Sequence, residues 1–117
     1  MNTLLIVDDD ESIRLLMRDE FCDRDYNVIT AIDGEEALVT FNEAEVDLVI
    51  LDMNIPKLNG AQVFKHLNEK SPETPVIIFT ANPDMVYDIG DIDKLQVVYK
   101  SSDLDELIKK VDVILDA

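Results

Sequence analysis

Five short apolar segments recur along the chain, each rich in valine, isoleucine or leucine and none with a clean polar alternation. They lie at Leu4–Val7, Val28–Ala31, Leu48–Leu51, Val76–Phe79 and Val97–Tyr99. Short apolar runs of this kind are typical of strands that are buried on both faces of a sheet. The pattern therefore predicts five buried strands.

Amphipathic segments alternate with these runs and predict helices. The clearest is the last, where the apolar residues follow helical spacing: Leu104, Leu107, Ile108, Val111, Ile114 and Leu115. An apolar stripe that includes Ile13 and Met17 predicts a first helix. Asp33 with Glu36 forms a capping-box pattern and predicts the start of a second helix.

Two further helices are expected between the third and fifth strands. An apolar stripe from Ala61 to Leu67 predicts a third helix, which Gly60 precedes and Ser71-Pro72 ends. The segment 82–94 contains proline and glycine and has only a weak helical stripe. It predicts a short or irregular fourth helix.

The alternation of strands and helices predicts the fold class. Alternating β and α segments form a parallel sheet with helices on both faces. No linker or internal repeat interrupts residues 1–117, so we expect one α/β domain with a doubly wound sheet. In such sheets, ligands bind outside the carboxyl ends of the strands.

Polar residues follow the predicted strands at that edge. The first strand is followed by Asp8, Asp9 and Asp10, and the third by Asp52. The fourth and fifth end at a hydroxyl and an ammonium group, which are those of Thr80 and Lys100. The apolar runs carry few polar residues elsewhere, so this edge is the predicted site.

The clustered carboxylates indicate a hard cation. Two ionised carboxylates ~4 Å apart repel by about 4 kcal/mol at an effective dielectric constant of 20. Mg²⁺, or a similar hard divalent cation such as Mn²⁺, takes oxygen ligands and binds through carboxylates together with phosphate oxygens. An aspartate can act as a nucleophile in phosphoryl transfer. Asp52 is the best candidate, because it follows the most hydrophobic strand.

The charge balance limits the partners. The 26 acidic and 10 basic residues give a formal net charge of −16, which disfavours direct binding to nucleic acid or to anionic membranes. The single cysteine, Cys22, excludes a disulfide framework, and we expect it to be a small core or half-buried residue. Because the sequence has no signal-peptide pattern and no long apolar run, a cytoplasmic location is expected.

Four motifs together resemble the receiver domain of bacterial two-component response regulators. They are the acidic pair Asp8-Asp9 after the first strand, Leu51-Asp52-Met53-Asn54-Ile55-Pro56 with Gly60, Phe79-Thr80-Ala81, and Lys100. Each motif is weak alone, but their order and spacing are specific. The resemblance extends from Thr3 to Leu115. It implies one receiver domain over residues 1–117, with the strand order 2-1-3-4-5.

The resemblance also implies a role for each site residue. Asp52 would accept a phosphoryl group from a histidine kinase or a histidine phosphotransfer protein. Asp9, Asp52 and the backbone carbonyl of Asn54 would ligate Mg²⁺ directly, and Asp8 would act through a metal-bound water. Lys100 would pair with Asp52 before transfer and with the phosphoryl group afterwards.

The implied output is a change in partner binding. The hydroxyl of Thr80 would move onto the phosphoryl group and signal its presence to the face formed by the fourth helix, fifth strand and last helix, where an effector domain or protein binds. Such a domain would be a phosphoacceptor that assists its own phosphorylation and dephosphorylation, not a turnover enzyme. Two positions depart from the family: Ser101 replaces the usual proline, and Val97 the usual aromatic residue.

Three alternatives remain at this stage. A haloacid-dehalogenase-like phosphatase would use Asp8 as the nucleophile and Asp10 as the acid-base group. A degenerate receiver would bind partners without being phosphorylated. A flavodoxin-like electron carrier would need a phosphate loop after the first strand, where the acidic triplet at residues 8–10 would instead repel the flavin phosphate.

Overall fold

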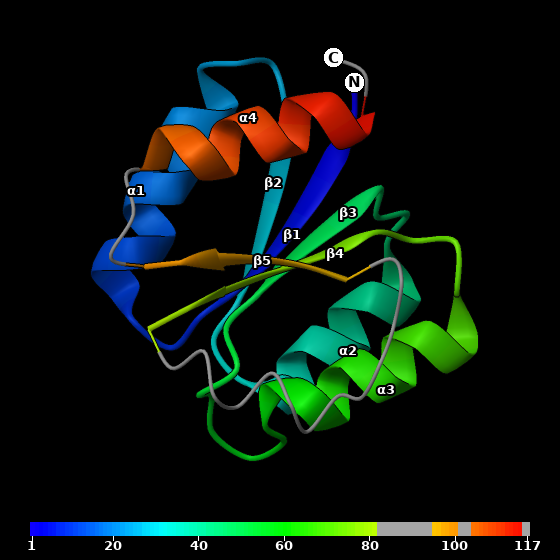
Figure 1. The fold of residues 1–117 in the computed structure, drawn as a ribbon. Coiled ribbons are helices and arrows are strands. Elements are labelled where there is room, and N and C mark those ends of the chain that lie inside the picture. The colour runs from blue at the N-terminus through cyan, green and yellow to red at the C-terminus, as the bar shows by residue number, and fades with distance from the viewer. Residues whose placement is uncertain (82–94, 101–103, 116–117) are drawn as a thin grey trace.

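The computed structural model describes residues 1–81, 95–100 and 104–115. Its strands are β1 (Thr3–Val7), β2 (Asn27–Ala31), β3 (Leu48–Leu51), β4 (Val76–Thr80) and β5 (Leu95–Tyr99). Its helices in these ranges are α1 (Glu11–Cys22), α2 (Gly34–Glu43), α3 (Gly60–Lys70) and α4 (Leu104–Leu115). The strands form one parallel sheet in the order β2-β1-β3-β4-β5, as predicted (Figure 1).

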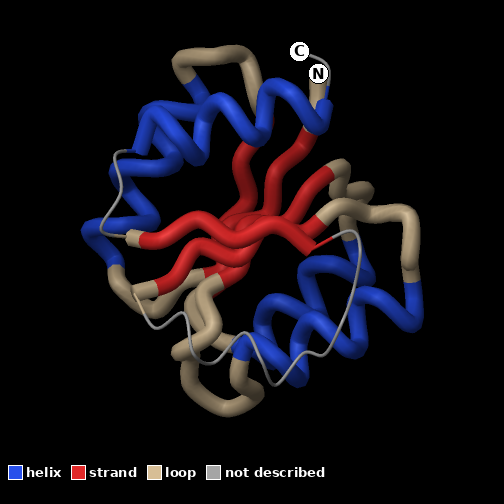
Figure 2. The backbone as a smooth tube through the Cα atoms, in the orientation of Figure 1, coloured by secondary structure: helices blue, strands red, loops and turns tan. Residues whose placement is uncertain are grey.

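Helices cover both faces of this sheet, with α1 and α4 on one side and α2 and α3 on the other (Figures 1 and 2). The strands supply alternate residues to the two sides. Leu4 and Ile6 pack with α1 and α4, whereas Leu5 and Val7 pack with α2 and α3. Because both faces are covered, the central strands are apolar at nearly every position.

Polar side chains define where the helices begin. The Asp10 carboxylate caps α1 by accepting hydrogen bonds from the amides of the helix's first turn, and Asp33 caps α2 by accepting one from the Glu36 amide. Asn59 and Gln62 form a capping box at α3. The predicted cap at Asp33 is therefore confirmed, but its box is incomplete, since the Glu36 side chain accepts from the Ile32 amide.

Some predictions about burial and boundaries were wrong. Strands β2 and β5 lie at the two edges of the sheet, so neither is enclosed on both faces: the middle of β2 is half-buried, and β5 ends at the exposed Tyr99. Gly60 is the first residue of α3 and does not precede it. Cys22 is exposed at the end of α1, where Phe21 occupies the core instead.

Several predictions concern parts of the chain outside the described residues. The fourth predicted helix lies in the segment 82–94, and the backbone after Lys100 lies in the segment 101–103. Among the helices in the described ranges, none combines the length and the apolar character needed to cross a bilayer.

Candidate functional site

The parallel register brings Asp8 and Asp52 to the same edge of the sheet. Val7 is the register partner of Leu51, so the two aspartates directly follow a matched pair of residues. The backbone amide of Asp52 donates a hydrogen bond of 3.0 Å to the Val7 carbonyl oxygen, and the Asp8 amide donates one of 3.1 Å to the carbonyl oxygen of Ala31. These bonds continue the ladder past the strands and fix both backbones.

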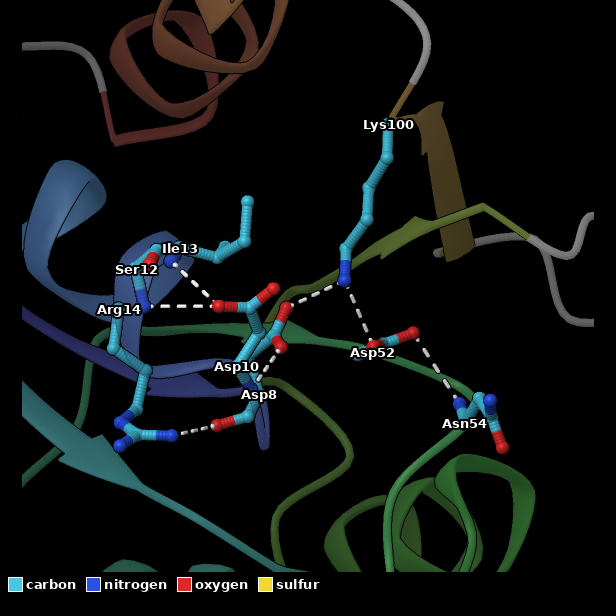
Figure 3. Close-up of polar contacts among 8 residues, drawn as sticks. All are labelled: Asp8, Asp10, Ser12, Ile13, Arg14, Asp52, Asn54 and Lys100. Carbon is cyan, nitrogen blue, oxygen red and sulfur yellow. Dashed lines mark hydrogen bonds and ion pairs between the residues drawn. The ribbon is translucent and has the colours of Figure 1, made fainter.

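The Lys100 ammonium group lies between the two carboxylates (Figure 3). Its Nζ atom is 2.7 Å from Asp8 Oδ2 and 2.9 Å from Asp52 Oδ2. The same nitrogen lies 6.0 Å from the centre of the Phe79 ring. The Lys100 amide donates a 3.0 Å hydrogen bond to the Thr80 carbonyl oxygen, so the start of the side chain is anchored to β4.

Burial determines the electrostatics of this group. Asp8 is 1% exposed and Asp52 is 5% exposed. Burial raises the pKa of the Asp8 carboxyl and the nearby Asp52 charge adds to the rise, although the Lys100 ammonium and the Asp10 amide oppose it. Burial lowers the pKa of Lys100, but its hydrogen bonds to Asp8 and Asp52 and their charges outweigh this and raise it. One ammonium group thus serves two carboxylates.

Asp9 completes an acidic cluster. One carboxylate oxygen from each of Asp8, Asp9 and Asp52 lies within 4.8 Å of the others. Asp9 is exposed, whereas the other two residues are buried. A donor set of oxygen atoms only, with a surplus of negative charge, suits a hard divalent cation. The cluster is consistent with a magnesium site.

The loop after β3 is held close to Asp52. The backbone amide of Asn54 donates a 3.2 Å hydrogen bond to Asp52 Oδ1 (Figure 3). The amide of Gly60 donates one of 3.0 Å to the Met53 carbonyl oxygen. A Cβ atom on Gly60 would lie 2.5 Å from Met53 Cα, so the close approach of the loop requires glycine there. Asn54, the predicted carbonyl ligand, is therefore adjacent to the acidic cluster.

Thr80 is fully buried at the end of β4, in register with Tyr99 of β5. Val97, at the position that is usually aromatic in the family, packs against the hydrophobic core between the sheet and helices α2 and α3. Tyr99 is 48% exposed. The structure therefore brings Asp8, Asp9, Asp52, Asn54, Thr80 and Lys100 to one edge of the sheet, while the aromatic side chain of Tyr99 lies on the surface.

Sequence reasoning missed one contact that supports the acidic pair. Arg14 Nη1 donates a 2.8 Å hydrogen bond to the backbone oxygen of Asp8 (Figure 3). The available signal was an arginine in the first turns of a helix that begins directly after three aspartates. Asp10 has a different task, because its carboxylate caps α1. This disfavours the phosphatase alternative, in which Asp10 was the acid-base group.

Comparisons with known proteins agree with this geometry. The family model described as the response regulator receiver domain matches residues 4–112. The alkaline phosphatase synthesis transcriptional regulatory protein PhoP of Bacillus subtilis is 41% identical over 81 residues, which cover 69% of this chain and 34% of PhoP. The response regulator ArlR of Staphylococcus aureus is 30% identical over 117 residues, which cover 98% of this chain and 53% of ArlR. The chain thus spans a third to a half of these relatives.

Solved structures extend the comparison to three dimensions. The response regulator protein TrrA from Thermotoga maritima, in complex with Mg²⁺-BeF, is 33% identical with a TM-score of 0.84 and covers 97% of this chain and 99% of its own. A second structure holds TrrA in complex with the histidine kinase ThkA, again with 33% identity and a TM-score of 0.84, over 98% of this chain and 99% of TrrA. The chain therefore belongs to the response regulator receiver domain family of two-component signal transduction, whose members are phosphoacceptors rather than turnover enzymes.

Proposed function

We propose that this domain is a phosphorylation-dependent switch in which Asp52 accepts a phosphoryl group from a histidine kinase or a histidine phosphotransfer protein. The observation that carries the proposal is the Lys100 ammonium group, which contacts the carboxylates of Asp8 and Asp52 beside Asp9 at the carboxyl edge of the sheet. That arrangement joins a nucleophile, a fixed cation and an oxygen ligand set, which are the parts that phosphoryl transfer requires.

Asp52 is the acceptor in this proposal. One of its oxygens accepts from the Asn54 amide and the other contacts Lys100, so the carboxylate is oriented before a donor arrives. A carboxylate oxygen attacks the phosphorus of a phosphohistidine. The new O–P bond forms as the P–N bond breaks, and the imidazole leaves with the electron pair and takes up a proton. Asp8 has one oxygen on Lys100 and the other on the Asp10 amide, and at 1% exposed it is enclosed, so Asp52 is the more accessible acceptor.

The other residues stabilise charge on the transferred group. The ammonium of Lys100 is fixed near Asp52 and neutralises a phosphoryl oxygen after transfer. Asp9, Asp52 and the Asn54 carbonyl would hold Mg²⁺, or Mn²⁺, with Asp8 acting through a water. When bound, the cation would offset the negative charge of the phosphoryl oxygens. The Thr80 hydroxyl would donate to the phosphoryl group, and this movement would change partner binding at the face that includes β5 and α4.

The surface beside the site supports a protein as the phosphodonor. Helix α1 begins just after the acidic residues, and its Leu15 and Leu16 are 51% and 50% exposed. Ile32, at 46% exposed, follows β2 and lines a groove with Leu15. Exposed apolar residues gathered in this way suit the docking of another protein. The complex of the relative TrrA with a histidine kinase agrees with such a donor. The output partner would be a downstream effector domain or protein.

Intact-mass measurement tests the proposal. The chain is incubated with Mg²⁺ and acetyl phosphate, whose P–O bond to acetate breaks as the bond to Asp52 forms. The expected result is a gain of one phosphoryl group that is absent from Asp52→Asn and from samples with EDTA. Phosphate release that depends on Asp8 and not on Asp52 would overturn it. No mass gain with any phosphodonor would favour a degenerate receiver that acts as a binding module.

A further inference from the structure

The loop that carries Asn54, residues 52–59, packs against the first turn of α2. The amide of Gly34 donates a 3.3 Å hydrogen bond to the Pro56 carbonyl oxygen. A Cβ atom on Gly34 would lie 2.3 Å from the backbone oxygen of Leu58, so the loop and the helix are in direct backbone contact. This contact lies just outside the strands, between the loop that follows β3 and the helix that follows β2.

Lys57 occupies the turn of this loop in an unusual conformation. Its φ angle is 69°, in the left-handed region that favours glycine. Its ammonium nitrogen lies 3.5 Å from Asp33 Oδ2 and 3.5 Å from Glu35 Oε2, both in or next to the first turn of α2. A glycine would adopt this backbone conformation without strain. A lysine here therefore costs conformational energy and provides a cation between two carboxylates.

The charges at this contact are mutually favourable. The Glu36 amide and then the Lys57 ammonium hold the pKa of the Asp33 carboxyl below its ordinary value. The carboxylates of Asp33 and Glu35 raise the pKa of Lys57. Asp33 is 8% exposed and is fixed as the helix cap, so one partner of the ion pair is rigid.

We propose that Lys57 is a positioning residue for the acceptor site, because its ion pairs with Asp33 and Glu35 hold residues 52–59 against α2 and thereby fix the backbone at Asn54. The loop transmits this constraint over a short distance. The hydrogen bond from the Asn54 amide to Asp52 closes its first turn, and the bond from the Gly60 amide to the Met53 carbonyl oxygen joins its two ends. The inference rests on the proposed function, since it concerns the residues that would hold the divalent cation.

Calorimetric titration of Mg²⁺ into Lys57→Met and Lys65→Met tests this. Lys65 lies on the exposed face of α3 and provides the matched loss of one positive charge. Charge alone predicts that both variants bind Mg²⁺ equally tightly or more tightly than the unsubstituted chain. Positioning instead predicts three- to tenfold weaker binding by Lys57→Met alone, with binding nearly restored in Lys57→Arg. Equal or tighter binding by Lys57→Met would overturn the proposal.

Hydrogen exchange of the Gly34 and Asn54 amides, measured without Mg²⁺, separates this inference from the proposed function. Faster exchange of both amides in Lys57→Met but not in Lys65→Met supports the role of the ion pairs even if Asp52 fails to accept a phosphoryl group. Unchanged exchange overturns it even if Asp52 is phosphorylated normally. Lys57→Gly removes the ion pairs and allows the same backbone conformation without strain. Unaltered Mg²⁺ affinity in that variant would also count against the proposal.

Discussion

The ammonium nitrogen of Lys100 lies 2.7 Å from Asp8 Oδ2, and the two side chains are 18% and 1% exposed. The same ammonium group contacts Asp52 at 2.9 Å. Among the described residues, Lys100 is the only positive group in contact with these two carboxylates. They therefore share one counter-charge. The stability of the metal-free protein and its affinity for a cation depend on this shared pair.

Replacing Lys100 with methionine should destabilise the metal-free protein. Two buried carboxylates would lose their counter-charge, which typically costs 3–5 kcal/mol at fully buried sites. Because Lys100 is partly exposed, we expect a loss of about 1–3 kcal/mol. Urea unfolding at pH 7 measures it, with Lys65→Met as the control. Mg²⁺ should stabilise the variant more than the unsubstituted chain, and an equal Mg²⁺ effect on both would contradict the shared-charge model.

Replacing Asp8 with asparagine should stabilise the metal-free protein at neutral pH. The folded protein raises the pKa of Asp8 above 3.8, so its favourable contribution is present below that pH and is lost as the pH rises through the folded-state value. Removing the charge should add about 0.5–2 kcal/mol, as is usual when a strained functional site is relieved. Unfolding at pH 7 and pH 4 measures the difference, which should shrink at pH 4. A stability difference that is larger at pH 4 than at pH 7 would contradict the prediction.

Replacing Tyr26 with phenylalanine should weaken the contact between the segment before β2 and helix α4, and so destabilise the protein. The Tyr26 hydroxyl donates a 2.6 Å hydrogen bond to Asp112, and its ring, which is 4% exposed, packs edge-on against Phe21. Phenylalanine keeps the ring and removes a bond to a charged group, so a loss of about 1.5–3 kcal/mol is expected. Chemical denaturation measures it, and Tyr99→Phe at an exposed position is the control. A loss equal to that of the control would refute the contribution of the bond.

The same contact predicts a loss of stability at alkaline pH. Burial, followed by the bond to Asp112, raises the pKa of Tyr26 from 10.0 to about 12. The stabilisation that Tyr26 gains from its buried, protonated hydroxyl is therefore complete below pH 10 and is lost as the pH rises towards 12. The difference in stability between the unsubstituted chain and Tyr26→Phe should accordingly narrow between pH 9 and pH 11.5. Denaturation curves across that interval test whether the stability difference narrows as the pH rises.

Replacing Gly60 with alanine should destabilise the protein although alanine is the better helix former. The added Cβ would lie 2.5 Å from Met53 Cα and 2.8 Å from the Asp52 carbonyl oxygen. Overpacking of this kind costs about 1–3 kcal/mol. Glu69→Ala, on the exposed face of α3, controls for helix propensity. Mg²⁺ affinity should fall in Gly60→Ala alone, and unchanged stability would show that the loop can move aside.

The strands and the site were predictable because they share one physical origin. Apolar runs mark strands that are covered on both faces, and the residue after each run lies at the edge where ligands bind. Asp8 and Asp52 follow Val7 and Leu51, which are register partners, so reading where the runs stop was enough to bring the aspartates together. The helical spacing of the apolar residues from Leu104 to Leu115 likewise predicted α4.

The rest depends on side-chain contacts that the sequence pattern does not specify. Arg14 lies close to Asp8 in the sequence, but this proximity alone does not show that its guanidinium donates to the Asp8 carbonyl oxygen. Lys57 reaches Asp33 from a distant segment, so no local pattern predicts that contact. Cys22 was wrongly expected to be at least half-buried because cysteine is usually buried, whereas here its neighbour Phe21 faces the core. The edge position of β2 was implied by the strand order that the family resemblance gave, whereas the apolar pattern taken alone wrongly indicated a strand enclosed on both faces.

The division of the core by the sheet has an energetic consequence. Leu67 belongs to the cluster beneath α2 and α3, and Leu107 to the cluster beneath α1 and α4. Substitutions in the two clusters share no side-chain neighbours, so their effects on stability should add to within about 0.3–0.5 kcal/mol. Helices on one face can then diverge in sequence without compensating changes on the other.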